Sequence, residues 1–99
     1  MIKAEEYKEF IISSLKEIMA VDSPTGFSGA VNRKLEEMLK EMGYRAQVTN
    51  KRLVKVSVAG RSHDKKIAVS AHVDTLGAMV RSVSADGKIR FTRLGGPIL

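Results

Sequence analysis

The sequence predicts an α/β fold in which two amphipathic helices precede a sheet. Three observations predict it. Apolar residues recur at helical spacing as far as Gly43, and beyond it they alternate with polar ones as in strands. Turn-forming residues, among them Pro24 and the pair Asp86–Gly87, separate these segments. Two helices followed by strands suit the edge of an α/β layer, and 99 residues suffice for one small domain.

The N-terminal half is predicted to form two helices. The first covers residues 4–20 and is expected to bury one apolar stripe, formed by Tyr7, Phe10, Ile11, Leu15, Ile18 and Met19. Ser28 is the predicted N-cap of a second helix that reaches Met42, and Gly43 is its predicted C-terminal stop. The side chains expected to face inward from this helix are Val31, Leu35, Met38, Leu39 and Met42.

The C-terminal half is predicted to form strands. Residues 44–49 and 53–59 alternate apolar and polar side chains, and Asn50–Lys51 separates them. Residues 67–73 are the most apolar of these segments and are therefore the predicted central strand. The pair Asp86–Gly87 predicts a hairpin between the alternating runs on either side of it.

The net charge of +6 is unevenly distributed along the chain. Residues 1–43 carry a net charge of −2, whereas residues 44–99 carry +8. A basic half is one property of nucleic-acid-binding domains. Here, however, the basic residues alternate with apolar ones along predicted strands, which is typical of a solvated sheet face, and no cluster of aromatic residues accompanies them. No nucleic-acid partner is therefore expected.

The composition also limits the compartment and the chemistry. The chain has no cysteine, which excludes a disulfide framework and a thiolate metal site and fits a cytoplasmic protein. No apolar run is long enough for a membrane-spanning helix, so no membrane partner is expected.

His72 and Asp74 are the candidate site residues. Two residues apart on a strand, they would project from the same face, near the carboxyl end where α/β sheets bind ligands. A neutral imidazole is a common metal ligand and often has a carboxylate partner that fixes its tautomer. The spacing is equally compatible with a hydrogen bond inside a core, without any ligand. His63 lies in a polar loop and is expected to be exposed, and no further cluster offers the three ligands a metal needs.

Residues 67–97, "IAVSAHVDTLGAMVRSVSADGKIRFTRLGGP", resemble the N-terminal signature of the tetrahedral aminopeptidase family. This group depends on cobalt or zinc and includes glutamyl and deblocking aminopeptidases and proteins labelled cellulase M. The matching positions are Ala71, His72, Asp74, Gly77, Met79, Val80, Gly87, Phe91, Gly95 and Gly96. Upstream, "SPTGFSG" resembles the family's turn of the form small-Pro-x-Gly-x-Ser-Gly.

The resemblance implies a fold and a site. Residues 1–74 would belong to an α/β/α zinc-peptidase-like domain with two helices and a mixed sheet, and residues 75–99 would begin an inserted β-barrel domain that mediates dimerisation. His72 would be a ligand of one of two divalent metal ions, zinc or cobalt, and Asp74 would orient that histidine. The implied partners are a peptide substrate and, at full length, further copies of the chain in a dimer or a dodecamer.

The remaining functional residues of the family would follow the inserted domain. They are a bridging aspartate, a pair of glutamates, another acidic ligand and a second histidine, and all would lie after Leu99. Thr75 also stands where the family often has an acid. The chain by itself is therefore expected to be inactive. The alternatives are a non-catalytic assembly or binding module and, with less support, a small basic nucleic-acid-binding domain.

Overall fold

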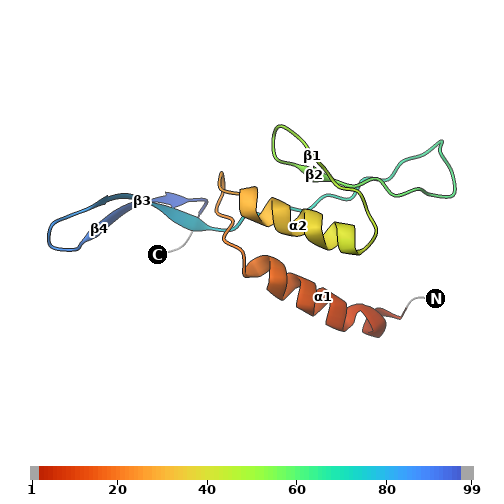
Figure 1. Cartoon of the computed structure of the whole chain (residues 1–99), viewed down its shortest axis with the longest axis horizontal. Helices are drawn as coiled ribbons and strands as arrows, with labels where there is room; N and C mark the ends of the chain where they lie inside the picture. Colours follow the sequence, from red (N-terminus) through yellow and green to blue (C-terminus); the bar gives the residue numbers. More distant parts are fainter. Residues whose placement is uncertain (1–2, 97–99) are drawn as a thin grey trace.

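The structure is a computed structural model that describes residues 3–96 of the chain. Two helices come first and two hairpins follow (Figure 1). The elements in chain order are α1 (Ala4–Met19), α2 (Gly29–Glu41), β1 (Gln47–Val48), β2 (Val54–Lys55), β3 (Gly77–Val83) and β4 (Ile89–Leu94). The prediction of a mixed α/β chain with helices before strands is confirmed.

Both helices begin and end within one residue of the predicted positions. Ser28 occupies the N-cap position of α2, although its side chain makes no capping hydrogen bond. At the other end Gly43 has a φ of +83°, a left-handed conformation that favours glycine. The amide of Gly43 donates to the carbonyl of Lys40, and that of Tyr44 donates to the carbonyl of Leu39. This pair of bonds is a Schellman motif, so the predicted role of Gly43 as the helix stop is confirmed.

The apolar stripe of α1 is not buried, contrary to the sequence prediction. No residue of this helix is buried, and Phe10, Leu15 and Met19 expose about half of their surface or more. α2 lies between α1 and the β1–β2 hairpin, so α1 is covered on one side only (Figure 1). Of the inward-facing residues predicted for α2, Val31 is buried, while Met42 is exposed.

The strands form two separate antiparallel pairs. β1 pairs with β2 through Gln47 and Lys55, and β3 pairs with β4 from Gly77 and Leu94 at one end to Val83 and Ile89 at the other. The ladder between β3 and β4 is irregular between Val80 and Ser82. The predicted hairpin around Asp86–Gly87 is therefore confirmed, whereas β1 and β2 are much shorter than the predicted strands.

The predicted central strand at residues 67–73 does not form among the described residues. Ile67 and Val69 are 95% and 94% exposed. A strand needs a neighbour to satisfy its backbone amides and carbonyls, and none of the described strands pairs with this segment. The prediction of a mixed sheet is wrong for residues 3–96, since both sheets are antiparallel and the one parallel contact is an isolated bridge between Pro24 and Thr75.

The described chain is elongated and has a small core. Its radius of gyration is 18.1 Å, whereas a compact domain of this length has about 13 Å. The buried residues in the described part are Val31, Ser23 and Asn32. All three come from α2 and the loop before it, which makes this region the structural centre of the chain.

None of the helices described here has the length and the apolar character that crossing a membrane requires.

Candidate functional site

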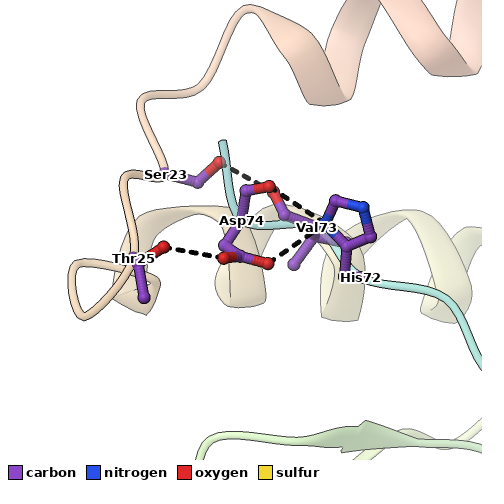
Figure 2. A network of polar contacts seen from close by, with 5 residues as sticks. All are labelled: Ser23, Thr25, His72, Val73 and Asp74. Carbon is purple, nitrogen blue, oxygen red and sulfur yellow. Dashed lines mark hydrogen bonds and ion pairs between the residues drawn. The ribbon is translucent and has the colours of Figure 1, made fainter. Parts of the chain in front are cut away.

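The structure brings His72 and Asp74 into contact. His72 Nδ1 lies 3.1 Å from Asp74 Oδ1 and 3.1 Å from the backbone oxygen of Asp74 (Figure 2). Both residues lie in the extended segment between β2 and β3, just before the bridge of Thr75 to Pro24. The predicted proximity of the two side chains is therefore found, although no paired strand supports them.

The contact fixes which imidazole nitrogen carries a proton. A carbonyl oxygen can only accept a hydrogen bond, so we assign the proton of neutral His72 to Nδ1, which donates to the two oxygens of Asp74. Nε2 then keeps its lone pair, and no hydrogen bond of residues 3–96 reaches it. The His72 side chain is 86% exposed. This tautomer and exposure suit a metal ligand that binds through Nε2.

A loop before α2 holds the Asp74 segment in place. The hydroxyl of Thr25 donates to Asp74 Oδ2 at 2.7 Å, and the hydroxyl of Ser23 donates to the carbonyl of Val73 at 2.9 Å (Figure 2). The amide of Thr75 in turn donates to the carbonyl of Ser23 at 2.9 Å. Ser23 is 1% exposed, so its polar atoms are satisfied by this segment rather than by water.

Gly77 allows a close contact between the start of β3 and the loop before α2. Glycine at this place could let backbone approach a bound group. In the structure a β-carbon added at Gly77 would lie 2.6 Å from the β-carbon of Pro24, closer than two such atoms can approach. The glycine therefore lets the start of β3 pass next to Pro24.

The electrostatics of the pair favour a charged aspartate. The hydroxyl of Thr25 lowers the pKa of Asp74 below its usual value, and the hydrogen bond from His72 lowers that pKa further. Partial burial acts in the opposite direction but does not outweigh the two hydrogen bonds. Asp74 is therefore ionised at neutral pH and serves as a hydrogen-bond acceptor for the imidazole.

The described residues do not complete a metal centre. A metal site in a protein needs at least three protein ligands. Nowhere in residues 3–96 do three histidine, cysteine, aspartate or glutamate side chains gather. His63 is exposed, in line with its prediction, and lies in the loop after β2. The arrangement at His72 fits one ligand with its orienting carboxylate, and further ligands would have to come from other residues.

Sequence reasoning missed Ser23 and Thr25. The sequence pattern of "SPTGFSG" indicates a break between two helices and forms part of the family resemblance, but it does not point to either hydroxyl. Thr25 is 49 residues from Asp74 in the chain, and spacing carries no information over such a distance. A useful signal would have been the small polar residues on both sides of a proline, which give a loop hydroxyl groups that can bind a neighbouring backbone.

Comparisons with known proteins agree on one family. The family model of the M42 glutamyl aminopeptidases matches residues 53–98. YhfE of Bacillus subtilis (strain 168), which is named as a candidate aminopeptidase, is 35% identical over 82 residues, or 83% of this chain and 24% of its own length. The glutamyl aminopeptidase of Lactococcus lactis subsp. cremoris (strain MG1363) is 31% identical over 87 residues, or 87% of this chain and 24% of its own.

The chain spans about a quarter of the length of these two curated relatives. No solved structure matches it significantly. The family match includes His72 and Asp74, and the two relatives align with more than four fifths of the chain. Residues 53–98 thus match the M42 peptidase family, and the chain corresponds to an N-terminal portion of two aminopeptidase relatives.

Proposed function

We propose that this chain is the N-terminal part of a metal-dependent aminopeptidase that removes N-terminal residues from peptides. One observation carries the proposal: within a segment that matches a peptidase family, His72 is held by Asp74 through Nδ1 and presents Nε2 to solvent. In this proposal Nε2 is a ligand of one of two divalent ions, zinc or cobalt. Such ions, when bound, supply an activated water and polarise the scissile carbonyl.

Asp74 has a positioning role in this proposal. A carboxylate that accepts the Nδ1 proton fixes the tautomer and the ring orientation of a metal-binding histidine and makes Nε2 a better ligand. The lowered pKa of Asp74 keeps the carboxylate charged over the neutral pH range. The other metal ligands and the general base would come from residues outside this chain, so residues 1–99 alone are expected to be inactive.

The proposal extends to domains, partners and location. Residues 1–74 would contribute to a peptidase domain and residues 75–99 would begin an inserted β-barrel domain. The bridge between Pro24 and Thr75 is a parallel contact at this boundary. We further propose that the complete protein acts on peptides in the cytoplasm and assembles with copies of itself, as a dimer or a larger oligomer.

The test is hydrolysis of an aminoacyl anilide by the complete natural protein with added zinc or cobalt. Wild-type protein is expected to turn over the substrate, and His72→Ala is expected to lose at least a hundredfold in kcat/KM. His63→Ala is the matched control, because His63 is exposed and takes no part in the hydrogen bonds of the pair. Full activity of His72→Ala, or turnover by residues 1–99 alone, would contradict the proposal.

An assembly module is the second candidate function. Ile67 and Val69 are almost fully exposed, and Val80, Val83, Ile89 and Phe91 leave about half of their surface or more uncovered on the β3–β4 hairpin. Such apolar surface and unpaired strand edges favour association with another chain. This candidate explains the exposed surface but not the contact between His72 and Asp74.

A further inference from the structure

The Ser23–Thr25 loop makes a contact with Asp74 that the proposed function does not use. Thr25 Oγ1 lies 2.7 Å from Asp74 Oδ2, while Asp74 Oδ1 lies 3.1 Å from His72 Nδ1. Each oxygen of this carboxylate thus has one side-chain partner, as Figure 2 shows. Because a carboxylate is planar, a bond at Oδ2 also fixes the direction in which Oδ1 faces.

The loop itself is fixed on both sides of Asp74. The residue before Asp74 accepts a hydrogen bond from the Ser23 hydroxyl, and the residue after it donates one to the Ser23 carbonyl. Pro24 lies against Gly77 so closely that no larger residue would fit there. Threonine is also branched at its β-carbon and has few side-chain rotamers. The hydroxyl of Thr25 therefore reaches Asp74 from a well-defined position.

We propose that Thr25 is a positioning residue, whose hydroxyl orients the Asp74 carboxylate and through it the His72 imidazole. The proposal rests on the proposed function of His72 as a metal ligand. Thr25 touches neither the metal nor the substrate. It acts by restricting the rotation of the carboxylate, so that Oδ1 stays directed at Nδ1 and the lone pair of Nε2 keeps one direction.

The expected effect is smaller than that of removing Asp74. The backbone oxygen of Asp74 also lies 3.1 Å from His72 Nδ1 and still accepts its proton when the carboxylate turns away. Partners of metal-binding histidines typically change metal affinity 10- to 100-fold when mutated. Thr25 is one contact further from the metal than Asp74. Thr25→Val is therefore expected to weaken zinc binding about tenfold, at the lower end of this range.

The experiment measures zinc affinity by chelator competition in the complete natural protein. Thr25→Val keeps the shape of the side chain and removes the hydroxyl, whereas Thr25→Ser keeps the hydroxyl and is expected to stay within about twofold of wild type. Thr25→Ala is the second variant if valine disturbs the loop. The melting temperature of the metal-free protein is recorded for each variant, and it should remain unchanged while the zinc affinity falls.

A double-mutant cycle tests whether Thr25 acts through Asp74. In an Asp74→Ala background, Thr25→Val is expected to cause no further loss of zinc affinity. The proposal is overturned if Thr25→Val binds zinc like wild type, if Thr25→Ser is as weak as Thr25→Val, or if the loss persists in the Asp74→Ala background.

His72→Ala separates the two proposals. If it reduces zinc affinity but Thr25→Val does not, only the role of Thr25 is overturned. If His72→Ala leaves zinc affinity unchanged, the metal-ligand role of His72 is overturned, and the role of Thr25 with it.

Discussion

Asn32 is the most buried amide side chain of the described structure and joins α2 to the β1–β2 turn. It is 5% exposed, and its Nδ2 donates to the carbonyl of Arg52 at 2.9 Å. Arg52 has a φ of +62°, a left-handed conformation that costs a residue with a side chain about 1–2 kcal/mol. The hydrogen bond from Asn32 therefore contributes to holding this turn in an unfavourable backbone conformation.

Asn32→Ala is expected to destabilise the protein by about 1–2 kcal/mol, because it removes a buried hydrogen bond and the group that holds Arg52. The measurement is the free energy of unfolding in urea of the complete natural protein. Glu37→Ala, an exposed position of the same helix, is the matched control and should change stability by less than about 0.5 kcal/mol. Equal effects of the two substitutions would contradict this role of Asn32.

At the scale of residues, sequence spacing predicted the contact between His72 and Asp74 but not the contact between Thr25 and Asp74. His72 and Asp74 are two residues apart, so an extended backbone brings their side chains together whether or not a sheet forms. The contact of Thr25 with Asp74 depends on the course of the chain through α2 and the β1–β2 hairpin, and no local pattern contains it. The roles of His72 and Asp74 remain predictions.

At the scale of elements, the two hairpins use the same kind of turn. In the β3–β4 turn the amide of Ser84 donates to the carbonyl of Lys88, and that of Gly87 donates to the carbonyl of Ser84. Thr49, Arg52 and Leu53 repeat this pattern in the β1–β2 turn. Both turns are three-residue loops whose last residue is left-handed, a favoured hairpin connection.

Gly87→Ala is expected to weaken the β3–β4 hairpin by about 1 kcal/mol, because Gly87 has a φ of +81° that alanine adopts only at a cost. Amide hydrogen exchange in β3 and β4 should become about fivefold faster, as this free energy implies. Gly96→Ala is the control, since this glycine has no left-handed conformation and open space around it. Identical exchange rates in both variants would show that the conformation of Gly87 does not contribute to the stability of the β3–β4 hairpin.

The β3–β4 turn is also expected to respond to acid through Asp86. The ammonium group of Lys88 and, to a smaller extent, the hydroxyl of Ser84 lower the pKa of Asp86. A carboxyl whose pKa is lowered on folding stabilises the folded state above its unfolded value, about 3.9, and loses this contribution as the pH falls through the folded value. Carboxyl carbon-13 titration should give a midpoint below 3.9 that rises in Lys88→Gln. A normal midpoint in wild type would contradict the contact.

Sequence patterns correctly predicted the elements that nearby residues stabilise. They failed for the elements that need a neighbouring segment to pair with or pack against. The helices and the β3–β4 hairpin depend on nearby residues such as Gly43 and Gly87. Both are glycines at positions with a left-handed backbone, so the residue type itself predicts a helix end or a turn. Residues 67–73 have the composition of a central strand, but composition does not supply a neighbour to pair with. The buried stripe predicted for α1 failed for the same reason, since one side of this helix is uncovered.

At the scale of the whole molecule, the described chain exposes the surfaces that its sequence suggests should be buried. It is elongated, 62 Å in its longest dimension, and its aligned part covers 24% of the length of each curated relative. An apolar segment that is exposed on both sides gains about 25 cal/mol for each Å² of apolar surface that becomes covered. Residues 67–73, α1 and the β3–β4 hairpin are therefore the surfaces expected to contact other protein segments.

Residues 1–99 produced alone are expected to associate at high concentration, because the exposed apolar faces then cover one another. Light scattering coupled to size exclusion measures the mass as a function of concentration. The double variant Ile67→Lys, Val69→Lys is expected to shift the chain toward the monomer without changing α1 or α2. A wild-type chain that stays monomeric at high concentration would contradict this expectation and the assembly candidate with it.

The most direct test of the central claim is a crystal structure of the complete natural protein with zinc bound. We expect His72 Nε2 to ligate a zinc ion at about 2.0–2.1 Å, with Asp74 accepting the Nδ1 proton and Thr25 bonded to the other carboxylate oxygen. The further ligands should come from residues outside positions 3–96. A zinc centre that does not include His72 would contradict the claim.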